Sequence, residues 1–326
     1  MMLDVVGKRY YFFLLSLLVL VPGIISLVLP GGLRPGIDFS SGSIMTIQFG
    51  QPVDQSALRN EFTTLGHPEA IVQRTGGEGA NTFIVRTYTL KAEQKDASGQ
   101  VTAPSERQTV EDALKKQFGN LQVLSFDSVS PLIASEIVRN AVIAVAAASV
   151  GILLYIAYAF RRVRKSFRWG TCAVIALVHD SLVVLGAFSV LGRLFEIELD
   201  AMFITAVLTI IGFSVHDTIV VFDRIRENYG RRMGDTFENI VNHSIMQTMA
   251  RSLNTSLTVL LVLVTLYLFG GVTTRSFVLA LLIGIVTGTY SSIFVAASLL
   301  VVWEKGEIKA GWRRLFGGRR AASATS

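Results

Sequence analysis

Six long apolar stretches run through this chain, and their length is the feature that most restricts its fold. The hydrocarbon core of a bilayer is roughly 30 Å thick, so a helix needs about twenty apolar residues to cross it. Soluble domains carry about a quarter charged residues, whereas here 17% are charged. The sequence therefore predicts a polytopic membrane protein with a six-helix transmembrane bundle. The predicted spans are Tyr10–Leu29, Asn140–Phe160, Thr171–Leu191, Ala201–Val221, Ser252–Phe269 and Ser276–Trp303.

Basic residues are distributed unevenly over the segments between the spans. Eighteen Lys and Arg lie on one side of the predicted bundle, and Arg193 and Arg275 lie in the short segments on the other. Cytoplasmic loops are enriched in Lys and Arg, so both termini are predicted to be cytoplasmic. This placement accounts for the net charge of +6 without a nucleic acid, and some basic residues are expected to touch anionic lipid. The eighteen are Lys8, Arg9, Arg161, Arg162, Arg164, Lys165, Arg168, Arg224, Arg226, Arg231, Arg232, Arg251, Lys305, Lys309, Arg313, Arg314, Arg319 and Arg320.

The polar region between the first two spans is expected to be an extracytoplasmic domain. Alternating apolar residues predict four strands, and two segments that begin with the capping residues Asp54 and Ser105 predict helices. The order βαββαβ indicates an α+β ferredoxin-like domain. Lys91–Ala103 is polar and contains Gly, so it is predicted to be a loop. The strands are Ser43–Phe49, Glu69–Arg74, Asn81–Leu90 and Leu121–Phe126, and the helices are Asp54–Leu65 and Pro104–Phe118.

The predicted organisation of the chain has four parts. Residues 1–29 form the cytoplasmic N-terminus and the first span, 30–138 the extracytoplasmic domain, 139–303 the other five spans, and 304–326 a basic cytoplasmic tail. A cytoplasmic loop, 222–250, interrupts the third part. Its apolar residues recur at helical spacing, which indicates an amphipathic helix lying at the membrane interface. These residues are Phe237, Ile240, Val241 and Ile245.

Ionisable residues inside a span are costly, so each is a candidate functional residue. Asp217 lies six residues before Asp223, roughly 9 Å into the membrane. A carboxylate removed from water takes up a proton more readily. A hydrogen bond that joins two helices is the structural alternative. Arg251 shares a helical stripe with three polar residues and is the expected counter-ion of Asp217, although it could instead anchor the helix at the interface. The stripe residues are Asn254, Thr255 and Thr258.

Other polar and small residues in the spans are weaker candidates. His179 and Asp180 are adjacent near mid-span and could relay a proton or simply pair by hydrogen bonding. For His216 a structural role is the preferred interpretation. Gly284 and Gly288 are four residues apart, a spacing that predicts close helix packing. No enzyme motif, metal-ligand spacing or cofactor motif is present in the sequence, so the chain is not expected to be an enzyme.

Several motifs together resemble the SecD/SecF family of protein-export membrane proteins, on its SecF side, within the RND-type transporter superfamily. Gly36–Gly42 is similar to the family's G-I-D-F-x-G-G motif, with Gly36, Asp38 and Gly42 in place and Ser41 where Gly is usual. Asp217–Asn228 resembles the fourth-span signature D-T-V-V-V-F-D-R-I-R-E-N. The resemblance marks Thr218, Phe222, Asp223 and Arg224 as further candidate functional residues. Further matches are His179-Asp180, Arg251–Ser256 and Gly288–Ser292. His216 stands where the family usually has Asn.

The resemblance implies a role in proton-driven protein export across the bacterial cytoplasmic membrane. It implies SecD, the SecYEG channel, a YajC-like auxiliary subunit and the translocating preprotein as partners. It also implies a proton as the coupling ion, no other cofactor, and a proton pathway through Asp217, Arg251, His179 and Asp180. Two alternatives stay open at this point. One is a half-size RND-type proton-coupled efflux transporter, and the other is a translocon scaffold that transports nothing.

Overall fold

The structure is a computed structural model that describes residues 4–75, 81–91, 94–95, 101–103, 105–161, 166–231, 235–271 and 274–307. The chain divides into a helical unit, Met1–Arg34 with Ile143–Ser326, and a sheet unit, Pro35–Val142. Several predictions fall outside the described residues. They concern the basic residues Arg162, Arg164, Lys165 and Arg232 and the tail from residue 308 onward.

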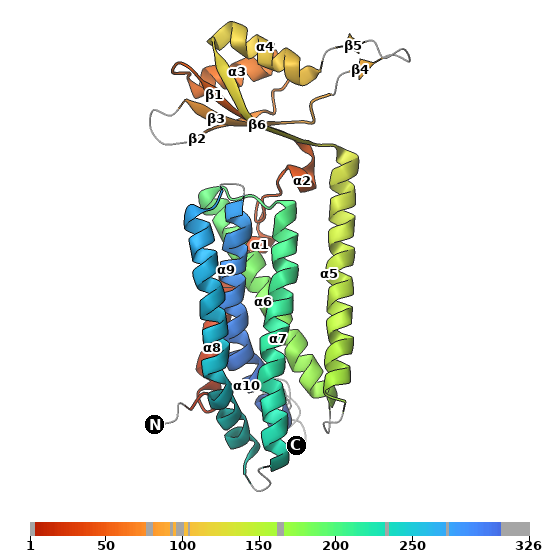
Figure 1. Ribbon diagram of the computed structural model, residues 1–326, viewed down its shortest axis with the longest axis vertical. Coiled ribbons are helices and arrows are strands. Elements are labelled where there is room, and N and C mark those ends of the chain that lie inside the picture. Colours follow the sequence, from red (N-terminus) through yellow and green to blue (C-terminus); the bar gives the residue numbers. More distant parts are fainter. Residues whose placement is uncertain are drawn as a thin grey trace, which may run out of the picture. The chain divides into compact units, whose positions relative to one another are not determined.

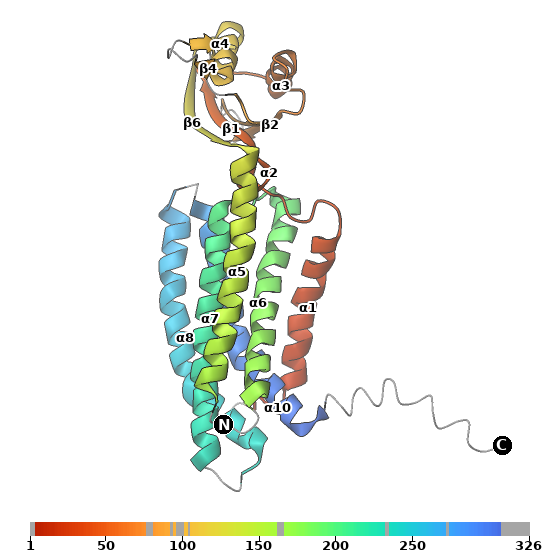
Figure 2. The same cartoon turned by 90° about the vertical axis from the view of Figure 1, so that its right-hand side faces the viewer.

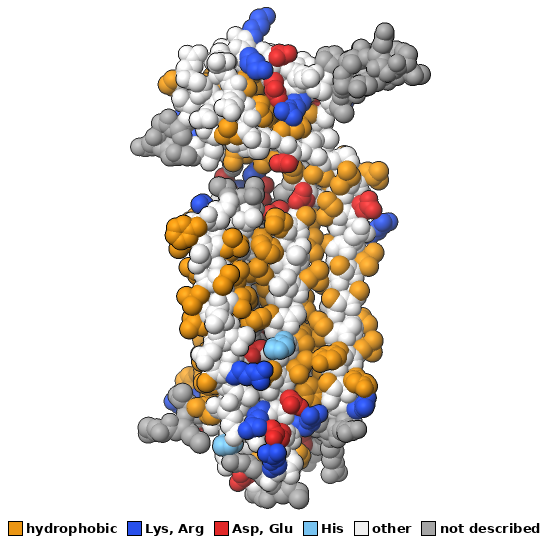
Figure 3. Space-filling model, in the orientation of Figure 1, with side chains coloured by type: hydrophobic (Ala, Val, Ile, Leu, Met, Phe, Trp, Pro, Cys, Tyr) orange, Lys and Arg blue, Asp and Glu red, His pale blue; other side chains and the backbone are white. Residues whose placement is uncertain are grey.

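Within the described residues, six helices are long and apolar enough to cross a membrane, which confirms the sequence prediction. In the last of them, α9 (Arg275–Tyr290) and α10 (Ala297–Lys305) are joined by a π-helical turn, η2 (Ser291–Ala296). Figure 1 shows α7, α8 and α9 side by side in the helical unit. Figure 3 shows apolar side chains along these helices and charged side chains gathered toward one of their ends. The other five are α1 (Arg9–Val28), α5 (Pro131–Ala159), α6 (Ser166–Phe195), α7 (Ala201–Arg231) and α8 (Phe237–Phe269).

The sheet unit contains a four-stranded antiparallel sheet in the order β2-β3-β1-β6. Together with its two helices this is the ferredoxin-like βαββαβ arrangement that the sequence predicts. Both helices lie on the same side of the sheet (Figure 1) and cover the fully buried Leu58, Phe62, Phe83 and Leu114. The elements are β1 (Gly42–Phe49), α3 (Gln55–Thr64), β2 (Ile71–Thr75), β3 (Thr82–Thr87), α4 (Glu106–Phe118) and β6 (Leu121–Val129).

The two helices of the sheet unit begin at the predicted capping residues. The Asp54 carboxylate accepts hydrogen bonds from the backbone of Ser56 and Ala57, and the Ser105 hydroxyl accepts one from Gln108. Each bond satisfies an amide that the first helical turn leaves without a partner. Hydrogen bonds from the Ser56 hydroxyl and the Ala57 amide lower the pKa of Asp54. The side chain that caps the helix therefore stays ionised and complements the helix dipole.

The prediction of a loop at Lys91–Ala103 is wrong in part. Two short strands, β4 (Gln94–Lys95) and β5 (Val101–Ala103), form an antiparallel ribbon there. A ribbon of this kind is held by backbone hydrogen bonds, and so it leaves no alternating apolar pattern in the sequence from which it could be predicted.

The predicted interfacial helix is also wrong as a separate element. Residues 237–250 are helical, but they are the first turns of α8 and continue into the fifth span without a break. Ile240, Val241 and Ile245 are almost completely buried. Asn228 of α7 donates to Ser244 at 2.8 Å and so ties the end of α7 to this part of α8. The apolar face is therefore covered by protein, a possibility that helical spacing alone does not distinguish from a membrane surface.

Helices α1 and α6 lie side by side (Figure 2), and two facing glycines bring their backbones into contact. A Cβ atom added at Gly186 would lie 2.7 Å from the Cα of Gly23. Beside this contact the hydroxyls of Ser26 and Ser189 are 2.7 Å apart. Arg193 of α6 donates to the carbonyl oxygens of Ser26, Leu29 and Pro30 at 2.8–3.1 Å. These carbonyls lie at the end of α1, where helical hydrogen bonds run out.

We expect Gly186→Ala to destabilise the helical unit, because the new methyl group meets backbone that cannot rotate away. Overpacking of this kind typically costs about 1–3 kcal/mol. Gly212→Ala is the matched control, since nothing lies within 4 Å of a Cβ added there. Thermal unfolding of the detergent-solubilised chain measures both variants. Equal midpoints for the two would contradict the close contact between α1 and α6.

We also expect the sheet unit to depend on pH through Glu69. Burial acts to raise the pKa of Glu69, but hydrogen bonds from the Thr87 hydroxyl and the Tyr88 amide, with nearby His67, leave it lowered. A lowered pKa in the folded state adds stability above the unfolded-state pKa, and this stability is lost as pH falls through the folded-state value.

Glu69→Gln should therefore lower the stability of the sheet unit at neutral pH, and the difference from the unmodified chain should shrink as pH falls below about 4.3, the unfolded-state value. Pulse proteolysis in urea measures the stability across this range. A difference that stays constant down to pH 3 would show that Glu69 acts through shape rather than charge.

Candidate functional site

Two carboxylates lie in the interior of the helical unit. Asp180 on α6 is 1% exposed and Asp217 on α7 is 7% exposed. A carboxylate away from water needs hydrogen-bond donors to remain charged. Asp180 has more hydrogen-bond donors among the described residues than Asp217 has.

Asp180 is held by three donors from three elements. The hydroxyl of Ser214 on α7 donates to its Oδ2 at 2.5 Å, and the hydroxyl of Ser291 in η2 donates to the same atom at 2.7 Å. Nδ1 of His179 lies 3.0 Å from Oδ1. The predicted His179–Asp180 pair is thus in direct contact, and the carboxylate joins α6, α7 and the last span.

Small residues bring α7 and the last span close enough for these bonds. Gly284 lies against Ile210, and Gly288 lies against Ser214, where an added Cβ would be 3.1 Å from the serine Cβ. Across the same contact the hydroxyl of Ser292 donates to the carbonyl oxygen of Ser214 at 3.2 Å. The hydroxyl oxygens of Thr218 and Ser292 lie 2.9 Å apart and are joined by a hydrogen bond. Thr218 is the residue after Asp217, so this ladder of hydroxyls extends from Asp180 to the turn that carries Asp217.

Asp217 faces α8. Its Oδ1 accepts a hydrogen bond of 2.5 Å from the Ser252 hydroxyl. Its Oδ2 is buried and makes no hydrogen bond within the described part of the chain. A buried oxygen that lacks a donor destabilises the charged form of a carboxylate, which a bound proton would relieve.

The predicted ion pair between Asp217 and Arg251 is not formed. Arg251 is exposed, and it makes no salt bridge to any residue that the structure describes. The reason is helical geometry, because successive side chains on a helix point about 100° apart. Ser252 faces Asp217, so its neighbour Arg251 turns outward.

Beside exposed apolar residues such as Leu253 and Leu257, α7 and α8 each carry a row of exposed polar and small residues. Arg251, Asn254, Thr255 and Thr258 of α8 are all exposed, as the predicted stripe requires. On α7 the exposed residues include Thr205, Thr209, Gly212 and His216. We call these eight residues the polar face. His216 belongs to it and not to the buried carboxylates.

The remaining signature residues of α7 hold the helix in place. Phe222 is fully buried and packs edge-on against Phe160 and Trp169. Asp223 forms an ion pair with Arg226 at 2.6 Å, and Arg224 binds Gln247 of α8 at 2.6 Å. These contacts are structural, because none of them involves the buried carboxylates.

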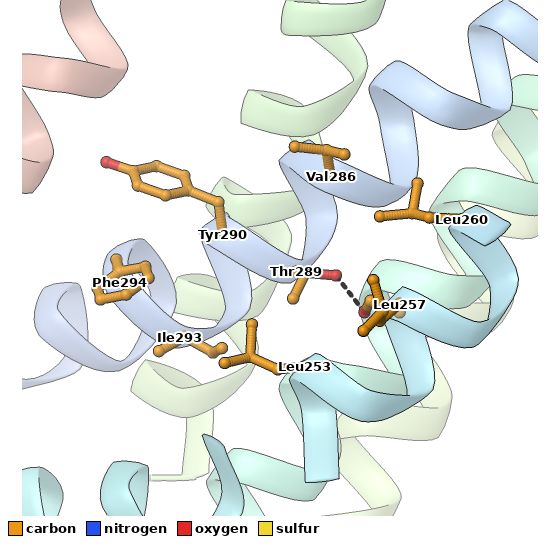
Figure 4. Close-up of a pocket in the computed structure, with 9 residues that line it drawn as sticks. Leu253, Leu257, Leu260, Val286, Thr289, Tyr290, Ile293 and Phe294 are labelled. Atoms are coloured by element: carbon orange, nitrogen blue, oxygen red, sulfur yellow. Dashed lines mark hydrogen bonds between the residues drawn. The ribbon is translucent and has the colours of Figure 1, made fainter. Parts of the chain in front are cut away.

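An apolar groove of about 320 Å³ lies between α8 and the last span. Figure 4 shows its walls, which include Leu253, Leu257, Val286, Tyr290 and Phe294. A hydrogen bond of 2.5 Å between Ser256 and Thr289 crosses from one helix to the other. The groove offers no charged side chain, so it is separate from the carboxylate chemistry.

The motif after the first span forms a tight turn into the sheet unit. Gly36 precedes the short helix α2 (Ile37–Ser40), and Asp38 lies in its first turn. Gly42 then adopts a φ of 130°, and a Cβ there would lie 2.7 Å from the carbonyl oxygen of Thr87. Ser41, the departure from the family pattern, has φ 62° and ψ 168°, a conformation that is essentially restricted to glycine.

Ser252 and Ser291, whose hydroxyls donate to the carboxylates, were not predicted as site residues. Ser252 and Ser291 lie within the motifs quoted for the family resemblance, so they were visible in the sequence. Their roles depend on which way each residue faces around its helix, and one residue of rotation decides that. The signal that could have identified them is the presence of Ser or Thr at helical spacing in every span that faces a carboxylate.

The fold and site define a class of protein. It is a polytopic helical membrane protein with an inserted sheet domain, and its interior carries carboxylates that hydroxyl groups hold between helices. Two family descriptions match the chain. Protein export membrane protein SecD/SecF, C-terminal, covers residues 109–306, and the SecD/SecF GG motif covers residues 31–53.

Relatives of known name extend the match to nearly the whole chain. Protein translocase subunit SecF of Thermobaculum terrenum is 52% identical, over 96% of this chain and 98% of its own length. The SecF subunit of Anaerolinea thermophila is 43% identical, over 99% of this chain and all of its own length. The crystal structure of SecDF from Thermus thermophilus has a TM-score of 0.75 and 32% identity. The match covers 94% of this chain and 39% of the longer SecDF chain.

This chain therefore belongs to the SecD/SecF family of protein export membrane proteins. SecDF relatives are longer than this chain. SecDF of Bacillus subtilis is 36% identical over 94% of this chain, and this chain accounts for 39% of its length.

Ser41→Gly should stabilise the sheet unit. The strained backbone of Ser41 costs of order 1–3 kcal/mol, and the greater freedom of glycine in the unfolded chain returns about 0.5–1 kcal/mol of that. We expect a net gain of about 1 kcal/mol. Pulse proteolysis of the full chain measures it, with Ser130→Gly as the control. A loss of stability would place the strain elsewhere.

Proposed function

We propose that the chain is the SecF-type subunit of a protein translocase, and that with a SecD-type partner it uses the proton motive force to assist translocation of polypeptides. The role is transport rather than catalysis. The observation that carries the proposal is Asp217, a buried carboxylate with one oxygen bonded to Ser252 and the other without a donor in the described chain. Such a group is suited to bind and release a proton.

The polar face supports a partner subunit. Hydrocarbon satisfies neither an arginine nor a row of hydroxyls, so polar residues in spans normally face protein or a wet cavity. The polar face includes Arg251, which neighbours the Asp217 donor Ser252. SecDF relatives carry a further length of chain about one and a half times that of this one, since this chain spans 39% of them. We infer that a SecD-type half covers the polar face and completes the proton site.

Charge distribution supports an orientation. The positive-inside bias favours cytoplasmic termini and an extracytoplasmic sheet unit in the bacterial cytoplasmic membrane. The sheet unit would then be on the side where exported polypeptide emerges. We propose the SecYEG channel, a YajC-like subunit and the translocating preprotein as the other partners.

The energy available is sufficient for a conformational cycle. Each positive charge that crosses the membrane releases about 2.3 kcal/mol per 100 mV, and about 1.4 kcal/mol shifts an equilibrium tenfold. Asp217 would pair with Arg251 in one state and with a proton in another. Arg251 lies near enough to Asp217 to act on its charge, but no ion pair joins the two side chains in the described chain, so pairing requires a rotation of α8 or an approach of the partner.

Asp217→Asn should abolish the stimulation of export by a proton gradient while the variant still inserts and assembles with its partner. Asparagine keeps the hydrogen bond to Ser252 but cannot exchange a proton. Export of a preprotein into inverted membrane vesicles, with and without a gradient, measures the effect.

Asp112→Asn is the matched control, because it removes a carboxylate that is 79% exposed on α4. It should leave the stimulation unchanged. Full stimulation in Asp217→Asn would refute the proton role, and failure to assemble would favour the structural role of Asp217. The scaffold alternative predicts no gradient dependence in any variant.

A further inference from the structure

The last span departs from α-helical geometry at Ser291–Ala296, and this π-helical turn begins at the serine that binds Asp180. A π-helix inserts one extra residue into a turn, is rare, and occurs frequently at functional sites. It persists only where neighbouring groups hold it. The groups in contact with this turn are therefore informative.

Two serines at the start of the turn make bonds in two directions. The Ser291 hydroxyl donates to Oδ2 of Asp180 at 2.7 Å and has the Gly288 carbonyl oxygen at 3.2 Å as an alternative acceptor. The Ser292 hydroxyl has the Gly288 carbonyl oxygen at 2.8 Å and the Ser214 carbonyl oxygen at 3.2 Å. A hydroxyl has one proton to donate. Each hydroxyl can therefore donate either to an acceptor on its own helix or to one on a neighbouring helix, but not to both.

We propose that Asp180 is a positioning residue whose carboxylate holds the π-helical turn of the last span against α7, and that the turn is released when Ser291 loses this acceptor. The carboxylate contacts Ser214, Ser291 and His179 at once. Without Oδ2 of Asp180 as an acceptor, the Ser291 hydroxyl turns to the Gly288 carbonyl oxygen within its own helix.

Release of the turn has a defined structural consequence. Removal of one inserted residue rotates the following helix by about 100° and moves it by about 1.5 Å along its axis. The helix that follows is α10, whose Glu304 pairs with Arg168 of α6 at 2.6 Å. Ser214 precedes Asp217 by three residues, so the same event reaches the turn that carries Asp217. The inference rests on the proposed function, because it provides the link between a bound proton and helix movement.

The other ionisable groups near Asp180 lie on its own helix and on the helices packed against it. On its own helix the neighbour is His179. Among the helices packed against α6, α7 contributes the buried Asp217 and α9 the half-buried Tyr290, whose hydroxyl donates to the Phe12 carbonyl oxygen of α1 at 2.7 Å. Arg9–Glu307 and Arg168–Glu304 are ion pairs at the ends of α1, α6 and α10.

Hydrogen–deuterium exchange of the full chain in lipid nanodiscs tests the proposal. Protection of residues 291–296, corrected for intrinsic exchange and compared with residues 278–285 of the same span, is measured for the unmodified chain and its variants at one pH. We expect Asp180→Asn and Ser291→Ala each to lower this protection about tenfold.

Two further variants separate this inference from the proposed function. Asp217→Asn should keep the protection of the unmodified chain, because Asp180 is intact. Ser298→Ala removes a buried hydroxyl of α10 that makes no hydrogen bond in the described chain, and it should behave like the unmodified chain. The proposal is overturned if Asp180→Asn and Ser291→Ala keep the protection of the unmodified chain, or if Ser298→Ala shows the same loss. None of these results would alter the export phenotype expected of Asp217→Asn.

Discussion

Polar groups inside a membrane-spanning bundle have to be hydrogen-bonded by the protein, because hydrocarbon offers them no partner. In this chain that requirement connects the helices. Asp180 receives donors from α7 and η2 as well as from its own helix. Ser26 pairs with Ser189 between α1 and α6, and Ser256 pairs with Thr289 between α8 and α9. Apolar side chains face lipid and other helices with equal ease, so these polar contacts determine which helix faces are turned inward.

Short side chains can make such contacts only where backbones come close together. Gly23 and Gly186 bring α1 onto α6, and Gly288 brings the last span onto Ser214 of α7. A Cβ added at Gly23 or Gly186 would lie within 3.0 Å of the facing backbone, and one at Gly288 would lie 3.1 Å from Ser214, so a larger residue would push apart helices that hydroxyl groups join. The glycines and the hydroxyl ladder thus depend on each other. This dependence explains why the motif around Gly288 contains both a glycine and two serines.

The sequence predicted the elements better than their contacts. Span length and strand alternation are local properties, and so the six membrane helices and the βαββαβ order follow from the residues directly. Which side of a helix meets which neighbour is a tertiary property. The expected pairing of Asp217 with Arg251 failed for this reason, because Ser252, one position away, faces the carboxylate instead. The buried face of residues 237–245 was likewise assigned to a membrane surface, since protein and lipid interiors select the same spacing of apolar residues.

In the proposed proton-coupled cycle, the two carboxylates have different roles. A group that exchanges protons cannot be fully satisfied in its charged state, since every added donor favours that state and makes the proton harder to accept. Asp217, which has one donor and one oxygen without a donor in the described part of the chain, meets this condition. A group that transmits the change must instead be bonded to several elements at once, as Asp180 is. The hydroxyls between them lie on one stretch of α7 and one turn of the last span, so a change in charge at either carboxylate alters the acceptors available to the same set of serines.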